Sequence, residues 1–154
     1  MSWIDDEAKK AKQFDEEKTR RERAYEQQVW GLWRDLQNQV KEDVDGINAN
    51  AELVSRRLGG EKLRIGQHPD GADGFQVTKI VYTAVYLNVA FRQRYLEVER
   101  LTVPNGPDRQ TSKARERFDI DIDPHYHLYF KDDGNNPITV ADLSRRLLTP
   151  LLNA

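Results

Sequence analysis

The densest group of residues that could do chemistry lies at 118–131, where acidic and apolar side chains alternate before two histidines. Asp121 and Asp123 share one face of the expected strand, because residues two apart in a strand point the same way. With a three-residue loop at 124–126, His127 lies opposite Asp123 across the hairpin. Carboxylate oxygens and an imidazole nitrogen suit a divalent cation. One hypothesis is therefore a metal-binding or metal-assisted hydrolase site at Asp121, Asp123 and His127.

The same hairpin register also has a purely structural interpretation, which we prefer. Carboxylates that lie opposite a lysine, a phenol and a histidine on a solvated face need no catalytic purpose. The apolar residues pair with one another on the opposite face, which supports the register. A loop of this kind usually has glycine at its left-handed position, and 124–126 has none. The expected cross-strand partners are Asp119 with Lys131, Ile120 with Phe130, Asp121 with Tyr129, and Ile122 with Leu128.

Signatures of the common enzyme classes do not occur in the chain. It contains no nucleophile elbow, Walker A, dinucleotide-binding or HExxH motif. Because it has no cysteine, it also lacks a thiol nucleophile and a thiolate metal site. We therefore expect no cofactor and lean toward a non-catalytic protein. Acids interrupt the basic runs at 18–23 and 109–117, and no aromatics interleave with them, so nucleic acid is not an expected partner.

Length and charge indicate one soluble domain. The chain has 154 residues, of which 24 are basic and 26 acidic. A chain of this size buries a single core, and nearly balanced charge creates no global field that would favour nucleic acid or acidic lipid. No run of about 18 apolar residues occurs, so no transmembrane segment is expected. Together with the absence of cysteine, this favours a cytoplasmic protein.

Residues 1–22 are expected to form a charged helical arm. Ser2 is placed to cap a helix that begins near residue 3, and acidic residues follow it in the first turn. Acid-to-base steps of four residues then support a solvated helix. The arm's larger apolar side chains are few, namely Trp3, Ile4 and Phe14, so a coiled coil with sustained apolar a and d positions is not indicated. The arm is either free in solvent or docks on a partner through these three residues.

Residues 23–154 are expected to form an α+β domain. From Tyr25, apolar residues recur at steps of three and four, so the helix continues and packs on the core until a break near Asn50. Period-two alternation then predicts an antiparallel meander sheet of five or six strands, and Thr139 caps a short C-terminal helix on the same sheet face. The expected strands are 63–67, 75–82, 84–92, 95–103, 118–123 and 127–131.

Two details of the sheet are also predicted. The Pro-, Gly- and charge-rich run at 104–117, which includes Arg109, is expected to be a long mobile hairpin loop. The apolar phase changes between Val98 and Leu101, which suggests a bulge near Glu99 and Arg100 or a strand end.

Three functions follow from this fold. The first is a small non-catalytic interaction or structural module, which binds a protein partner or itself. It would use the N-terminal helix or the wetter sheet face, where Tyr86, Tyr95 and Tyr129 are expected. The second is the metal site described above, and the third is a small-ligand site between sheet and helices.

Overall fold

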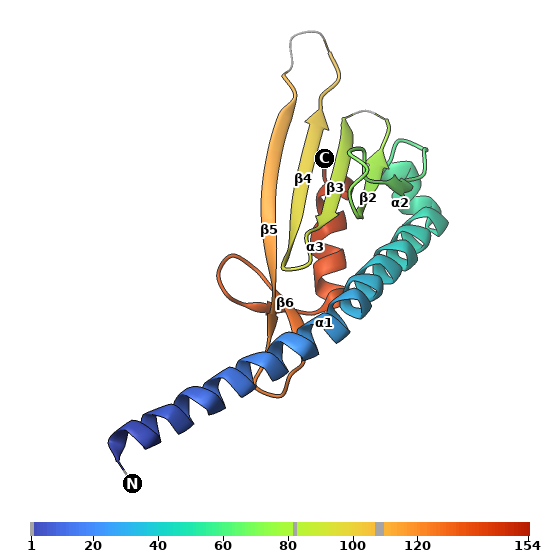
Figure 1. Ribbon diagram of the computed structural model, residues 1–154. Coiled ribbons are helices and arrows are strands. Elements are labelled where there is room, and N and C mark those ends of the chain that lie inside the picture. The colour runs from blue at the N-terminus through green and yellow to red at the C-terminus, as the bar shows by residue number, and fades with distance from the viewer. Residues whose placement is uncertain (1, 82, 107–109) are drawn as a thin grey trace.

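The computed structural model describes residues 2–81, 83–106 and 110–154, and it has the predicted α+β architecture (Figure 1). Seven described strands form one antiparallel sheet in sequence order, so the sheet is a meander. The long α1 and the short α3 cover the same sheet face. The elements are α1 Trp3–Ala49, α2 Ala51–Arg57, β1 Arg64–Gln67, β2 Gly74–Lys79, β3 Ala84–Phe91, β4 Tyr95–Val103, β5 Ser112–Ile122, β6 Leu128–Lys131, β7 Pro137–Ile138 and α3 Val140–Leu152.

Helix α1 begins and ends at side chains that cap it. The Ser2 hydroxyl accepts from the Asp5 amide at 3.3 Å, and the Asp5 carboxylate reaches back to Ser2, which completes a capping box. The helix ends at Ala49, and the Asn50 side chain caps α2 by accepting from the Leu53 amide at 3.1 Å. Both the start near residue 3 and the break near Asn50 are confirmed.

The core is a layer of side chains between α1, α3 and one face of the sheet. The Trp33 ring stacks against Phe75 and Phe91, with centroid distances of 5.8 and 5.0 Å. Trp30 meets the edge of Phe91 from the rim of the same interface, at 5.0 Å. Stacked and edge-to-face aromatic pairs add to the free energy of burial. The other buried residues of the helices include Tyr25, Val29, Leu36, Val40, Val44, Leu143, Leu147 and Leu151.

The prediction of a loop at 104–117 is wrong for its second half. β5 begins at Ser112, and residues 112–117 pair with 97–102 of β4 in regular register. The segment was missed because it has no apolar alternation. Three of its six partners on β4 are charged, and one of them, Glu99, forms ion pairs with Lys113 and Arg115. β7, a two-residue strand, was also missed. Arg109 lies outside the described residues, as does Tyr82, where a strand was expected to end.

The expected bulge near Glu99 and Arg100 is also wrong. β3 and β4 pair without interruption from Ala84 opposite Val103 to Phe91 opposite Leu96. The apolar phase changes because Arg100, not an apolar residue, occupies the core face opposite Leu87. Its side chain is only 12% exposed, and it binds Glu116 on β5 at 2.8 Å.

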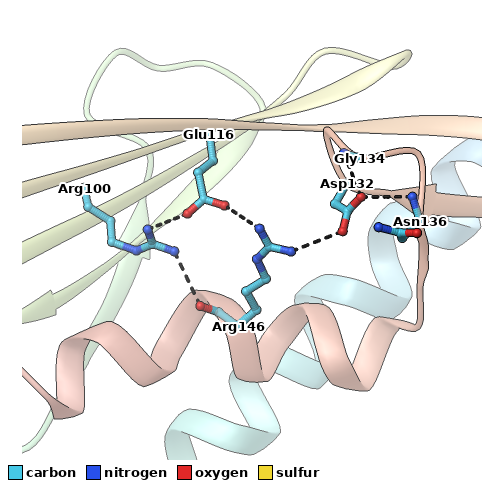
Figure 2. A network of polar contacts seen from close by, with 6 residues as sticks. All are labelled: Arg100, Glu116, Asp132, Gly134, Asn136 and Arg146. Carbon is cyan, nitrogen blue, oxygen red and sulfur yellow. Dashed lines mark hydrogen bonds and ion pairs between the residues drawn. The ribbon is translucent and has the colours of Figure 1, made fainter.

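A polar network therefore replaces apolar packing where α3 crosses this part of the sheet. Figure 2 shows Glu116 between Arg100 and Arg146, with contacts of 2.8 and 3.4 Å. Arg146 also reaches the Asp132 carboxylate at 3.5 Å. Asp132 accepts from the backbone amides of Asn136 and Gly134 in the turn before β7, which holds its pKa below the usual value. The network joins β4, β5, the turn and α3 through two carboxylates.

Replacing the central carboxylate tests this network. We expect Glu116→Gln to lower the free energy of unfolding by about 1 to 3 kcal/mol, because Arg100 would lose its charged partner in a largely buried position. Glu99→Gln is the matched control: the two glutamates are 31% and 32% exposed, but Glu99 meets its partners at 3.4 and 3.5 Å on the outer face. Its expected cost is below about 1 kcal/mol. Equal losses in urea unfolding would contradict the assignment.

Candidate functional site: the helical arm and the hairpin tips at its base

The N-terminal part of α1 projects beyond the sheet (Figure 1). Residues 3–16 are all exposed, and this segment is about 21 Å long at 1.5 Å per residue. Its apolar side chains face solvent: Trp3 is 74% exposed, Ile4 60% and Phe14 70%. An exposed group of large apolar side chains marks an interaction site more often than a scattered single residue does.

These exposed side chains continue the face of α1 that packs on the domain. Phe14 lies 11 residues after Trp3 and 11 before the buried Tyr25, which is three helical turns in each direction. Ile4, Ala8 and Ala11 follow steps of four and three on the adjoining part of that face. The apolar stripe of α1 therefore runs past the sheet, where no described element of the chain covers it.

The structure confirms the predicted register of the β5–β6 hairpin. Ile120 pairs with Phe130 and Asp121 with Tyr129, and the loop is 124–126. Tyr126 takes the left-handed position that glycine usually fills, with φ of 63°. The Asp123 carboxylate accepts from the amides of His127 and His125, at 2.9 and 2.8 Å, and these bonds lower its pKa.

This tip is attached to the base of the arm. The Tyr126 hydroxyl donates to Glu17 at 2.6 Å, which raises the pKa of the phenol, and Gln28 donates to the Tyr126 carbonyl. The Arg21 guanidinium donates to the Ile122 carbonyl at 3.0 Å. Contacts between helix and sheet thus begin at Glu17. Sequence spacing had suggested Glu17 and Arg21 as a solvated pair, and nothing in the helix pattern points to a hairpin 100 residues away.

The β3–β4 tip is attached to the next turn of the helix. The Tyr25 hydroxyl donates to the carbonyl of Gln93, which has a positive φ of 68°. Burial raises the pKa of Tyr25 to about 12, so its phenol remains a donor at neutral pH. The Arg94 guanidinium lies 4.0 Å from the centre of the Tyr25 ring and binds Glu22 at 2.9 Å. Two hairpin tips therefore hold α1 where its exposed part begins.

The three residues suggested as metal ligands are only partly brought together. Asp123 and His127 are neighbours, with 3.7 Å between Oδ2 and Nδ1. Asp121 instead binds Lys131 at 2.8 Å, which lowers the pKa of its carboxyl. Among the described residues, no group of three His, Asp or Glu side chains is placed to hold a metal ion. The structure adds no support to the metal hypothesis.

The outer sheet face carries the three tyrosines suggested for partner binding, each partly exposed. Tyr86 is on β3, opposite Leu101, and Tyr129 on β6 is opposite Asp121. The Tyr95 ring on β4 is covered by the Arg117 guanidinium at 3.8 Å, and Arg117 also binds Asp119 at 2.8 Å. This pair within β5, and the pairs of Glu99 with Lys113 and Arg115 across β4 and β5, satisfy part of this face within the chain.

A possible ligand groove of about 750 Å³ lies between α1, α2 and α3. Its lining includes the apolar side chains Ile47, Leu53 and Leu148 and charged side chains such as Glu42 and Arg145. These side chains form no convergent polar set that would identify a small ligand.

Comparisons of this chain with protein-family models, with curated proteins and with solved structures found no match. Within the described residues, no helix has the length and apolar character needed to cross a membrane.

Two truncations should distinguish the contribution of the exposed arm to stability from that of the attached part of α1. We expect deletion of residues 1–14 to leave the melting temperature of dilute protein nearly unchanged, because residues 2–14 are all exposed. Deletion of residues 1–22 also removes Glu17 and Arg21, and should cost about 1 to 3 kcal/mol for the lost hydrogen bonds. Thermal and urea unfolding measure both. Equal stability of the two truncated chains would show that the hairpin contacts contribute nothing.

The Asp123 carboxylate predicts a pH dependence of stability. Its pKa is lower in the folded chain than the value near 3.9 of an unfolded Asp, so ionisation favours folding. That contribution is present above about pH 4 and is lost as the pH falls through the folded-state pKa. Asp123→Ala should therefore be less stable than the parent at neutral pH, and the difference should close in acid. Asp133→Ala, at an exposed position in the next turn, is the control. A gap that persists at pH 2 would rule out the charge as its cause.

Proposed function

We propose that this protein is a non-catalytic interaction module, whose exposed helical arm binds a protein partner in the cytoplasm. The observation that carries this proposal is the apolar stripe of α1, which leaves the domain still bearing Trp3, Ile4 and Phe14 in solvent. An isolated helix of this length is only marginally stable in water, and most helices gain their stability from packing an apolar face. A partner that covers the stripe would supply that packing.

The arm is well suited to docking because the domain holds its base rigidly. Glu17, Arg21 and Tyr25 each bond to a hairpin tip, so the first turns beyond them extend from a fixed direction. A helix that is already formed and oriented loses less conformational entropy on binding than a disordered segment. The resulting mode of recognition is a helix whose apolar side chains, spaced at three and four residues, enter a partner's groove.

The outer sheet face is the weaker candidate for partner binding. Arg117 covers Tyr95, and Glu99 is shared between two basic residues. A partner would have to displace these contacts and desolvate the charges, which costs free energy before any new contact forms. On the arm, by contrast, the large apolar side chains are already free of intramolecular contacts of this kind.

Photo-crosslinking tests the proposal on the full chain. A benzoylphenylalanine in place of Phe14 should form covalent protein adducts in an extract of the source cells, because the side chain would sit in the bound interface. The same probe in place of Gln27, an exposed residue on the attached part of α1, is the control. Mass spectrometry identifies the adducts. If position 14 yields no protein adduct beyond those at position 27, the arm is not a binding element.

A further inference from the structure

We propose that the arm's partner is a second copy of this chain, and that the two arms pair as antiparallel helices centred near Gln13. This inference rests on the proposed function and names the partner for the same surface. Its basis is the order of charges along the arm. A two-fold symmetric interface must be complementary to itself, and the charge order of this arm meets that condition in only one of the two helix orientations.

The charges occur in four blocks of alternating sign. Residues 5–7 are three acids, 9–12 contain three bases, 15–17 are three acids, and 18–23 contain four bases and one acid. When the arm is reversed about Gln13, the acidic and basic blocks therefore exchange positions. Reversing the direction of the arm converts each block into one of opposite sign.

Antiparallel pairing therefore places every block beside its opposite. With the two-fold axis at the level of Gln13, 5–7 lies along 18–23 of the second chain, and 9–12 lies along 15–17. At residue level, the opposite charges nearest the face that carries Ala11 and Phe14 are Glu7 with Lys18 of the second chain, and Lys12 with Asp15. Parallel pairing in register would instead place like charges together over the whole arm, and such contacts cost several kcal/mol. Charge complementarity thus selects both the partner and the orientation.

Side-chain sizes agree with this arrangement. Ala8 and Ala11 are the small residues of the apolar stripe, and they would lie opposite the long Lys18 and the shorter Asp15. Small residues opposite longer ones let two helices approach closely. Phe14 lies one residue from the two-fold axis, so the two Phe14 rings would meet near the centre of the pair. Trp3 would lie level with Arg23 of the second copy, close to the hairpin tips of that copy.

Glu17, Arg21 and Glu22 contact the hairpin tips, and the other charges of the arm are available for such a partner. The ion pairs within the described arm are Glu7 with Lys10 and Glu17 with Arg20, each at 3.5 Å and at exposed side chains. Exposed pairs of this kind contribute about 0.2 to 0.5 kcal/mol, so they compete weakly with an intermolecular pairing.

A charge-exchange experiment tests the antiparallel pair. We expect the full chain to dimerise at micromolar concentration in light scattering, and to dissociate as added salt screens the blocks. The variant K9E/K10E/K12E and the variant D15K/E16K should each self-associate at least about tenfold more weakly, because the inner blocks would then repel. An equimolar mixture of the two should recover dimers, since each reversed block meets its opposite. The control R34E/K41E/K62E reverses three exposed bases outside the arm and should dimerise like the parent.

Each of the following results would contradict a different part of the proposed pairing. A full chain that stays monomeric up to about 1 mM overturns self-pairing. Variants that dimerise like the parent, or a mixture that recovers nothing, overturn the antiparallel charge pairing. The crosslinking experiment distinguishes these failures from failure of the proposed function: an adduct of Phe14 with a different protein leaves the arm a binding element but excludes the second copy as its partner.

Discussion

The interface between α1 and the sheet is the constraint on which the rest of the structure depends. An antiparallel sheet with one apolar face must have that face covered, and here α1 covers it together with α3. The Trp33 ring stacks against Phe75 and Phe91, and these contacts set the position at which the helix crosses the strands. At 47 residues, α1 is about 70 Å long, which is far more than the crossing requires. The excess length is the arm.

The transition from attached helix to arm is set by backbone geometry at two hairpin tips. Tyr126 and Gln93 both have positive φ, and both tips direct carbonyl oxygens toward polar side chains of α1. A non-glycine residue in this conformation carries a cost, which the surrounding contacts must offset. Here the contacts come from a helix distant in sequence, so the strain at the tips and the position of α1 support each other.

Charge is organised differently in the domain and in the arm. Within the domain, carboxylates such as Glu116 and Glu99 sit between basic side chains from neighbouring elements. In the arm, the same residue types lie in blocks along one exposed helix. The domain therefore neutralises its charge internally, whereas the arm presents a linear pattern that only another extended surface can match. That contrast, more than the amount of charge, supports the proposal that the arm is a recognition element.

Local pattern alone determined much of the architecture: the capped start of α1 at Ser2, its break at Asn50, the order of the strands and the register of the β5–β6 hairpin. These features depend on hydrophobic period and on side chains close in sequence. Tertiary structure decided the rest. Residues 112–117 form a strand because they pair with 97–102 of β4, and Arg100 could occupy the core face because Glu116 and α3 meet it there. The β5–β6 hairpin tip likewise attaches at Glu17 and Arg21 through contacts about 100 residues apart, which no local period encodes.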